Sequence, residues 1–576
     1  MKRLNRRLWF RFFRLAKKYW TEGEHVKAWG LLLLLVGLLL GYTYFSIRFN
    51  EQTGEFTSAL AKLDEDRFWK SIKIFVVLLV CAVPLNAFYY FIRDRLANSW
   101  RRWLTDFMQR KYFSDRSFYT LQDNTKIDNP DQRIAEDVNT FTKNSIGFLL
   151  VFIEAFLQLI GFSSVLWVIS HELVYFLAIY ATVGTLVTVG VFGRILTGLN
   201  FLQLKKEADF RFSLIRVREN AESIAFYQGE RLESSQIKLK FQDVFANMNK
   251  LIKWQFFLNM FLYAFDYSTY IVPAVVLAPA VLAKEIEVGT VVQAAGAFAA
   301  ILKALAVFIE KFDELSKFAA GVNRLDGFVQ AIDPTYAERA GTLVKPEEPP
   351  ALIERARGDA IDIDDVTLLT PDRRRTLIEN LSAVIQPGDN LIISGASGGG
   401  KSSLLRGIAG LWNAGTGKIA SPELGDMMFL PQQPYMSLGN LRQQLIYPRV
   451  EAEITDEQLG ELLKQVNLPD MVERVGGFDS VHDFGKMLSL GEQQRLSIAR
   501  LLSDKPKYAI LDEATSALDR KNEAAIYQLL VDSGITLVSV CHHPEVAKFH
   551  KHALELTGDG GWKLGPATEA ELAKHT

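Results

Sequence analysis

Cysteine is scarce in this sequence, with Cys81 and Cys541 as its two cysteines among 576 residues. Cys81 lies in a long hydrophobic run and Cys541 in the more polar second half, so the two are not placed to build a disulfide framework. A fold held together by disulfides is therefore excluded, and we expect the second half to face a reducing cytoplasm.

A strong charge of one sign is also lacking. Lys and Arg number 65 against 66 Asp and Glu, which leaves a formal net charge of −1. No basic stripe interleaved with aromatic residues occurs outside the segments that flank the apolar runs. We therefore expect no nucleic-acid partner.

Long apolar runs, in contrast, crowd the first 312 residues. A helix needs about 20 mostly apolar residues to cross a hydrocarbon core of roughly 30 Å. Six segments meet this requirement: Ala28–Ile47, Ile72–Ile92, Ser145–Ser170, Leu173–Leu196, Phe256–Leu282 and Thr290–Phe312. The first lacks a small-residue cleavage site, so it is interpreted as an uncleaved span rather than a signal peptide. Asp266, Pro273 and Pro279 interrupt the fifth, and the pair His171–Glu172 between the third and fourth predicts a tight hairpin.

Basic residues alternate between rich and poor segments along the chain. Lys and Arg number nine in residues 1–27 and ten each in 93–143 and 200–255, against four in 48–71, none in 171–172 and one in 283–289. Cytoplasmic segments of membrane proteins carry the excess of Lys and Arg. Both termini are therefore predicted to be cytoplasmic.

The same patterns divide the chain into four parts. Residues 1–27 alternate aromatic with basic side chains, which predicts an amphipathic elbow helix on the inner leaflet, with a disordered tail as the alternative. Residues 28–332 hold the spans and two polar cytoplasmic segments, which as helices would extend tens of ångströms beyond the membrane. Residues 333–359 are rich in Pro and Glu and read as a linker. Residues 360–576 alternate short apolar strands with helices, which is typical of a parallel α/β domain.

A glycine-rich loop in the second half carries the clearest chemistry. Residues 395–402 read Gly-Ala-Ser-Gly-Gly-Gly-Lys-Ser and fit G-x-x-x-x-G-K-[ST], with an apolar strand before them and a helix after them. Glycines let several backbone N–H groups turn towards a phosphate. The lysine is expected to reach the β- and γ-phosphates, and the last serine to ligate Mg²⁺. The residues expected to bind nucleotide here are Gly395, Ser397, Gly398, Gly399, Gly400, Lys401, Ser402 and Ser403.

A second apolar strand, Tyr508–Leu511, ends in two carboxylates, Asp512 and Glu513. Ligands of parallel sheets bind at the carboxyl ends of the strands. Asp512 is expected to hold Mg²⁺, directly or through water, and Glu513 to act as a general base on the attacking water. Many strands end in acids that only cap the next helix, so the position of this pair, about 110 residues after the glycine loop, supports the functional interpretation.

The run of residues 488–495, Leu-Ser-Leu-Gly-Glu-Gln-Gln-Arg, lies just upstream of that strand. It resembles the signature motif of ATP-binding cassette (ABC) proteins. By this resemblance Ser489, Gly491 and Glu492 belong to a nucleotide site, and the protein is an ATPase whose cofactors are ATP and Mg²⁺.

Two further family motifs are matched. Gln432, in Phe-Leu-Pro-Gln-Gln, corresponds to the glutamine loop and would also contact Mg²⁺. His542, in Ser-Val-Cys-His-His-Pro, corresponds to the switch histidine, with His543 as the alternative. The resemblance thus implies that Glu513, His542 and Gln432 are the catalytic residues.

Segments of the cytoplasmic extensions refine the resemblance. Asn129–Ile134 and Glu222–Gly229 are similar to motifs of the peroxisomal acyl-CoA ABC transporters and of their bacterial SbmA/BacA-like relatives, which include the mycobacterial importer of cobalamin and hydrophilic peptides. Pro434–Gly439 and Ile446–Pro448 add to the match. The resemblance implies an α-helical six-span membrane domain of the exporter-like, type IV ABC fold plus an α/β P-loop nucleotide-binding domain. Coupling elements are expected near Asn129–Ile134 and Ser223–Gly229.

Two positions depart from the family pattern. Leu490 stands where the signature usually has glycine or another small residue, although Ser489 and Gly491 are retained. Thr370 stands where many relatives place an aromatic residue that stacks on adenine. Recognition of the nucleotide base is therefore expected to be weaker or to use another aromatic side chain. GTP stays open as an alternative substrate to ATP.

One glycine loop and one signature are present in the chain. In this family the signature serine and glycine complete the nucleotide site of the opposite cassette. The resemblance therefore implies a homodimer with two composite sites related by two-fold symmetry, although a heteromeric dimer stays open.

Polar side chains inside the spans point to a transported solute, because a charge at the centre of a span costs roughly 2.5–3.5 kcal/mol. Glu154 and Gln158 share one face of the third span and Asp266 lies in the fifth. They are expected to line a polar cavity, with a buried interhelical hydrogen bond as the alternative.

These observations lead to one functional hypothesis. The chain is an ATP-driven transporter of the bacterial inner membrane, embedded in lipid, that moves a hydrophilic or amphipathic solute of the cobalamin or peptide type. An acyl-CoA or lipid-like substrate, or a membrane ATPase without a solute, are the alternatives. The direction of transport stays open.

Overall fold

The computed structural model describes residues 6–121, 129–333, 336, 352–541 and 543–568. They divide into two compact units, Met1–Val344 and Lys345–Thr576. Within the described residues the first unit is helical and the second contains all the strands. The chain therefore joins two different folds, each with its own cores.

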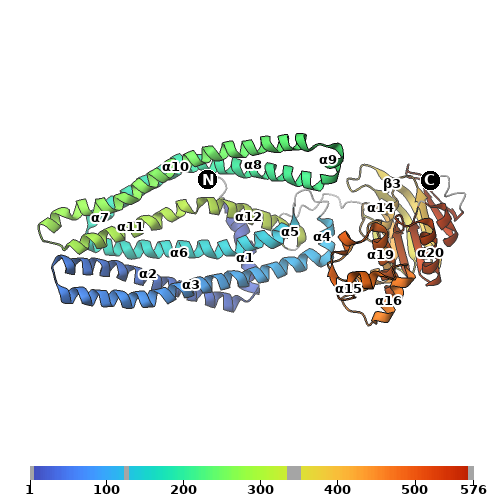
Figure 1. Cartoon of the computed structure of the whole chain (residues 1–576), viewed down its shortest axis with the longest axis horizontal. Coiled ribbons are helices and arrows are strands. Elements are labelled where there is room, and N and C mark those ends of the chain that lie inside the picture. Colours follow the sequence, from blue (N-terminus) through green and yellow to red (C-terminus); the bar gives the residue numbers. More distant parts are fainter. Residues whose placement is uncertain (1–5, 122–128, 334–335, 337–351, 542, 569–576) are drawn as a thin grey trace. The chain divides into compact units, whose positions relative to one another are not determined.

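Long helices build the first unit (Figure 1). Their bounds are α1 Arg6–Glu22, α2 His25–Ala61, α3 Glu65–Phe113, α4 Ser117–Thr120, α5 Pro130–Gln132, α6 Val138–Ile169, α7 His171–Val187, α8 Arg194–Glu219, α9 Ala221–Tyr227, α10 Glu230–Leu282, α11 Val288–Glu310 and α12 Phe312–Ile332. Two π-helical stretches, Arg133–Asp137 and Thr188–Gly193, join α5 to α6 and α7 to α8.

Six helical stretches of the described chain are long and apolar enough to cross a membrane. They are His25–Ala61, Glu65–Phe113, Pro130–Ile169, His171–Glu219, Glu230–Leu282 and Val288–Val307. Each overlaps one of the six predicted spans, so the prediction is confirmed. Pro273 and Pro279 lie inside α10 without ending it.

The hairpin between the third and fourth spans is tighter than predicted. The helix α6 ends at Ile169 and α7 begins at His171, which leaves Ser170 as the connecting residue. The Ser170 hydroxyl accepts a hydrogen bond from the Leu173 N–H at 3.3 Å. Because this serine caps α7, the pair His171–Glu172 belongs to the first helical turn instead of forming the loop.

The amphipathic segment at the N-terminus forms α1, which packs against α12. Leu15 and Tyr19 are buried, whereas Trp9, Phe10 and Phe13 are exposed. Apolar side chains therefore lie both on the face that packs against the other helices and on the exposed face, as an interfacial helix requires. Its placement on the inner leaflet stays a prediction.

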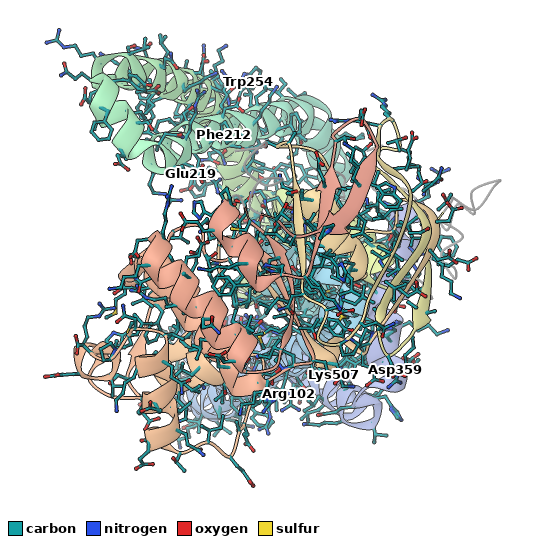
Figure 2. The ribbon with its side chains drawn as sticks, turned by 90° about the vertical axis from the view of Figure 1, so that its right-hand side faces the viewer. Arg102, Phe212, Glu219, Trp254, Asp359 and Lys507 are labelled. Atoms are coloured by element: carbon teal, nitrogen blue, oxygen red, sulfur yellow. The ribbon has the colours of Figure 1, made fainter. Side chains whose placement is uncertain are left out.

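Two of the helices extend well beyond the thickness of a membrane. The helices α3 and α10 contain 49 and 53 residues, which corresponds to roughly 75–80 Å at 1.5 Å per residue. The helix α8 packs along α10, and α9 closes the end of this arm. Figure 2 labels Phe212 and Glu219 on α8 and Trp254 on α10 in the arm.

A mixed sheet forms the centre of the second unit. Its order is β12-β11-β4-β10-β9-β6, and β11–β12 is its one antiparallel pair. The bounds are β4 Leu391–Gly395, β6 Met427–Leu430, β9 Tyr508–Asp512, β10 Thr536–Val540, β11 His552–Leu556 and β12 Trp562–Pro566. The strand β10 is buried on both faces, since Leu537 and Val538 belong to different cores. Such strands read as continuous apolar runs, which is why the sequence located them.

A second sheet has the order β1-β5-β2-β3. Its strands are β1 Glu354–Arg357, β2 Ile361–Leu369, β3 Thr376–Ile385 and β5 Gly415–Ser421. The strand β1 falls inside the predicted linker of residues 333–359 and pairs in parallel with β5. It was not identified from the sequence because Glu-Arg-Ala-Arg has no apolar pattern and is stabilised by pairing. Most of the remaining linker lies outside the described residues.

The helices of the second unit surround these sheets. Their bounds are α14 Lys401–Ile408, α15 Leu441–Ile446, α16 Asp456–Gln465, α17 Met471–Val475, α18 Phe484–Met487, α19 Leu490–Asp504 and α20 Arg520–Asp532. The helix α14 packs against β2, β4, β5 and β9, while α19 packs against α15 and α16. A sheet layered between helices confirms the predicted α/β fold.

Candidate nucleotide-binding site

The glycine loop follows β4 and leads directly into α14. Gly395, Gly398 and Gly400 have φ angles of 131°, 77° and 97°, in the region that favours glycine. A Cβ atom at Gly395 would collide with the carbonyl oxygen of Leu556 on the neighbouring strand. The loop therefore needs its glycines to turn backbone N–H groups towards an anion.

Lys401 is buried at the start of α14. Its Nζ donates to the carbonyl oxygens of Gly395 at 2.7 Å and Ala396 at 3.2 Å. Burial lowers the pKa of Lys401, and the carboxylates of Glu513 and Asp512 act in the opposite direction. An ammonium held in this way at the base of the loop is placed to meet the phosphates of a nucleotide.

Ser402 meets Asp512 across the sheet. The Ser402 hydroxyl donates to Asp512 Oδ1 at 3.1 Å, although the two residues lie 110 positions apart. Burial raises the pKa of Asp512, partly offset by this hydrogen bond. A hydroxyl and a carboxylate are oxygen donors of the kind that Mg²⁺ prefers, so the pair fits the predicted ion.

Glu513 adopts φ 49°, which is uncommon for a residue with a side chain. Its backbone N–H donates to the Val540 carbonyl at 3.0 Å. Gln432, which follows β6, donates from Nε2 to Glu513 Oε2 at 2.9 Å. The structure thus brings together the predicted metal ligands and two of the predicted catalytic residues, on an unusual backbone of the kind that clusters at functional sites.

The two candidate switch histidines follow β10, the neighbour of β9 in the sheet. His542 lies outside the described residues. His543 Nδ1 is hydrogen-bonded to Glu523 Oε2 at 2.6 Å. This hydrogen bond directs the His543 ring to Glu523 on α20. The switch role of His542 stays a prediction.

The predicted signature begins α19 with a capping box. The Glu492 carboxylate accepts from the Ser489 N–H at 2.9 Å and also pairs with Arg474 at 2.6 Å. Burial alone would raise the pKa of Glu492, but its hydrogen bonds from Arg474 and Ser489 outweigh burial and lower it. Glu492 therefore positions Ser489 at the helix start. A Cβ atom at Gly491 would lie 3.1 Å from the Ala517 carbonyl oxygen, which explains the small residue there.

Gln494 is a residue of the site that the sequence did not single out. It is 0% exposed. Its Nε2 donates to the Gln432 carbonyl at 2.9 Å and to the Ser516 hydroxyl at 3.3 Å, and its Oε1 accepts from the Ala517 N–H at 3.0 Å. One amide thus ties the signature helix to the glutamine loop and to the segment after Glu513. A polar residue at a core position of an amphipathic helix was the available signal.

Arg500 organises the segments that follow the glutamine loop. Its guanidinium donates to the carbonyl oxygens of Tyr435 at 2.6 Å and Gln444 at 2.5 Å, and it lies over the Tyr447 ring. Burial lowers the pKa of Arg500 to about 10. Both segments that carry the resemblance, Pro434–Gly439 and Ile446–Pro448, thus contact this buried cation.

The turn between β2 and β3 occupies the place of the usual adenine-stacking aromatic residue. The Thr370 hydroxyl donates to Asp372 at 2.6 Å and accepts from the Arg375 N–H at 3.2 Å, which closes the turn. Arg375 also donates to the Gly558 carbonyl at 3.4 Å. Gly558 in turn lies against Gly399 of the glycine loop. The planar guanidinium of Arg375 therefore lies near the glycine loop.

The predicted cavity residues of the membrane unit fall into two groups. Gln158 donates to Glu154 at 3.1 Å on α6, and both are half-buried. Asp266 is exposed on α10 beside Tyr263 and Tyr267. Within the described chain no hydrogen bond or ion pair joins the two groups. A shared cavity therefore stays a prediction.

The motif Asn129–Ile134 begins the helix that leads into α6. Arg133 is buried and donates to Asp137 at 2.9 Å, and Arg324 of α12 donates to the same carboxylate at 2.6 Å. The carboxylate of Asp137 thus accepts hydrogen bonds from both arginines, and these bonds hold the proposed coupling element against α12. The second element, Ser223–Gly229, occupies the exposed end of the α8–α10 arm.

Comparison with known proteins agrees with this geometry. Residues 18–282 match the family model of the ABC transporter transmembrane region 2, and residues 378–516 match that of the ABC transporter. An uncharacterized ABC transporter ATP-binding protein of Synechocystis is 42% identical, with 93% of this chain and 82% of the relative aligned. The chloroplastic ABC transporter D family member 2 of Arabidopsis thaliana is 36% identical over 96% and 86% of the two chains.

The mouse lysosomal cobalamin transporter ABCD4 is 32% identical, and the alignment covers 98% of this chain and 97% of the relative. The relatives thus match both units in one continuous chain. The protein belongs to the ABC transporter family, as a half-transporter of the D-family type that fuses one six-helix membrane region to one ATP-binding domain.

Proposed function

We propose that two copies of this chain use ATP hydrolysis to move a hydrophilic or amphipathic solute across a cell inner membrane. The convergence of Ser402, Asp512, Glu513 and Gln432 at the carboxyl edge of one sheet carries the proposal. These residues come from three separate sequence motifs and supply the groups that phosphoryl transfer to water requires.

The chemistry assigns a role to each side chain. Lys401 contacts the β- and γ-phosphates, where its charge stabilises the transition state. Glu513 takes a proton from the attacking water, and Gln432 holds the carboxylate of Glu513 in place. Mg²⁺, when bound by Ser402, Asp512 and Gln432, supplies charge neutralisation of the phosphates. His542 completes the set of residues around the γ-phosphate.

Two features support assembly from two copies. The signature residues Ser489 and Gly491 lie at the start of α19, which packs on different elements from α14 and its glycine loop. The α8–α10 arm exposes large apolar side chains such as Phe212 at 68%, Phe226 at 79% and Tyr227 at 86%. Exposed apolar surface on this scale indicates a protein partner, and a second identical chain supplies one for both features.

The polar groups Glu154, Gln158 and Asp266 favour a solute that forms hydrogen bonds. The relative named as a cobalamin transporter supports a cobalamin-like compound for this chain, and the resemblance to importers of hydrophilic peptides adds a peptide-like compound. An acyl-CoA or lipid-like compound is the second candidate, favoured by the resemblance of Asn129–Ile134 and Glu222–Gly229 to motifs of acyl-CoA transporters. Basic residues concentrate in residues 1–27, 93–143 and 200–255, which supports cytoplasmic termini.

The test is uptake or efflux of a labelled solute panel by inverted and right-side-out vesicles that contain the full chain. Glu513→Gln is the matched control, because it keeps the side-chain shape but removes the base. We expect ATP-dependent movement of one solute class with the wild type, and with Glu513→Gln no turnover but retained ATP binding. ATP hydrolysis that no solute stimulates would favour a membrane ATPase without transport. Full activity of Glu513→Gln would refute the assignment of the base.

A further inference from the structure

A cluster of three different metal-ligating side chains lies outside the nucleotide chemistry described above. It consists of Glu523 on α20, Cys541 directly after β10, and His543 two residues later. One ligand atom from each residue lies within 4.8 Å of the others. The pairs are already close, with Glu523 Oε1 3.6 Å from Cys541 Sγ and Glu523 Oε2 2.6 Å from His543 Nδ1.

The charge balance of the cluster calls for a cation. Glu523 is 2% exposed. In the described part of the chain its hydrogen-bond partners are Thr515 at 2.7 Å, Cys541 and His543, and its one ion-pair partner is His543. A buried carboxylate is stabilised by hydrogen bonds and by a nearby positive charge. A metal ion at this position would supply that charge.

We propose that Glu523, Cys541 and His543 bind one Zn²⁺ ion per chain. Zinc is held in proteins by Cys sulfur at about 2.3 Å, His nitrogen at about 2.0–2.1 Å and carboxylate oxygen at about 2.0–2.2 Å. A thiolate, a carboxylate and a neutral imidazole balance a divalent cation, so the occupied cluster has no net charge. The softness of the thiolate selects zinc over magnesium, which takes oxygen ligands.

The cluster also has an entry path. The His543 side chain is 38% exposed and Glu523 is 3% exposed on the same measure. The imidazole therefore forms the outer edge of the site, and solvent at this edge supplies the fourth ligand of a tetrahedral ion. Two of the ligands flank position 542 in the sequence, and Glu523 also contacts Thr515, two residues after Glu513. A bound ion would thus fix the chain on both sides of the predicted switch histidine.

Cobalt absorption tests metal binding without reference to transport. Co²⁺ reports a thiolate ligand by a charge-transfer band in the near ultraviolet, which oxygen ligands do not give. Chelator-treated, detergent-solubilised full-length chain is titrated with Co²⁺ in the absence of nucleotide. We expect one equivalent to produce the band and Zn²⁺ to bleach it by displacement.

The two cysteines of the chain give a matched pair of variants. Cys81→Ser removes the thiol of the membrane half and should leave the band unchanged, whereas Cys541→Ser should abolish it. His543→Gln keeps a polar side chain beside Glu523 but removes the imidazole ligand, and should weaken Co²⁺ binding at least tenfold. A band that survives in Cys541→Ser, or no band in Cys81→Ser, would overturn the proposal.

A functional consequence follows, and it rests on the proposed ATPase activity. Zn²⁺ at this cluster should slow ATP hydrolysis, because the chain around position 542 can no longer adjust to the nucleotide. The ratio of rates with and without Zn²⁺ is compared between Cys81→Ser and Cys541→Ser at saturating Mg²⁺-ATP. Inhibition confined to Cys81→Ser supports the consequence. Equal inhibition of the two variants would indicate that Zn²⁺ acts at the Mg²⁺ site, and would refute this consequence. The cobalt spectrum reports separately on metal binding to the cluster.

Discussion

Single polar side chains connect the motifs of the cassette, and Gln494 does so most directly. It bonds to Gln432, Ser516 and Ala517 from one buried position. Its replacement by alanine removes hydrogen bonds to part-buried groups of the two neighbouring segments, each worth about 0.5–1.5 kcal/mol. We therefore expect Gln494→Ala to lower the ATPase rate roughly tenfold or more, since Gln432 loses its support.

Binding of ATP should change much less than turnover in that variant, because the glycine loop makes no hydrogen bond to Gln494 within the described chain. Nucleotide binding by equilibrium fluorescence and steady-state hydrolysis separate the two effects. Gln528→Ala is the matched control, since Gln528 is exposed and bonds to Asp532 on its own helix. An unchanged hydrolysis rate in Gln494→Ala would contradict the proposed link.

A buried histidine should make cassette stability depend on pH. His550 bonds to Ser539 at 2.9 Å and to the Val546 carbonyl at 3.0 Å. Burial lowers its pKa from 6.5 to about 4. The unfolded chain therefore binds a proton below about pH 6.5 that the folded chain does not. This contribution to stability is fully present above pH 6.5 and falls by up to about 1.4 kcal/mol per pH unit as the pH drops towards 4.

Urea unfolding of the full chain in detergent, followed by tryptophan fluorescence between pH 4.5 and 7.5, measures this slope. In His550→Gln the free energy of unfolding should depend less steeply on pH over that range, by an amount that corresponds to about one proton. His25→Gln, at an exposed position at the start of α2, should leave it unchanged. The assignment fails if His550→Gln keeps the wild-type pH dependence.

At the scale of helices, contact between α2 and α11 depends on missing side chains. A Cβ atom at Gly289 would collide with the Gly54 carbonyl oxygen and the Ser58 hydroxyl. Because Gly289 has no side chain, its N–H can approach α2 and donate to the Ser58 hydroxyl at 3.0 Å. Small residues let membrane helices approach closely, so this contact is a packing point between the first and sixth spans.

Gly289→Ala should therefore separate the two helices and destabilise the membrane unit by about 1–3 kcal/mol, the usual cost of overpacking. Gly30→Ala is the control, because a Cβ atom at Gly30 meets nothing within 4 Å. Thermal unfolding in detergent, followed by the loss of helical circular dichroism, compares the two variants. A Gly289→Ala protein as stable as Gly30→Ala would contradict the packing argument.

The elements themselves were predictable where one physical pattern dominates. Apolar length located all six spans, and fully buried strands such as Leu391–Gly395 were visible as apolar runs. The strand Glu354–Arg357 was not, because its exposed polar side chains carry no period and its pairing with β5 is long-range. The connection between the third and fourth spans lies at Ser170 and not at residues 171–172, because the Ser170 side chain caps α7. Hydropathy alone does not locate such a cap.

The site was predictable to the same extent. Motif order located Lys401, Ser402, Asp512 and Glu513, but not the amide of Gln494 or the guanidinium of Arg500, whose partners come from distant segments. The cluster of Glu523, Cys541 and His543 also escaped the sequence, because α20 and β10 must fold before its atoms meet. Chemistry carried by contiguous motifs is readable from sequence, and chemistry assembled by packing is not.

At the scale of the whole molecule, the proposal requires that each nucleotide site is shared between two chains. Ser397 in the glycine loop and Leu490 in the signature are both exposed, so cysteines at these positions are accessible to a short bifunctional thiol reagent. One tagged chain carries Ser397→Cys and a second carries Leu490→Cys, both with Cys81→Ser and Glu513→Gln. Glu513→Gln is included because it should retain bound ATP.

Co-expressed chains should give a cross-linked band of two different tags with Mg²⁺-ATP and little without nucleotide, because closure brings the loop of one chain to the signature of the other. Either chain expressed alone should give no such band, since a two-fold axis pairs position 397 with 490 and not with itself. Cross-linking within a single chain that carries both cysteines would show that the site is complete in one protomer, and a band between chains whose yield is independent of ATP would show that ATP does not bring them together. In that case ATP could not drive the association of two chains, and the reason for a transporter built from half-molecules would be lost.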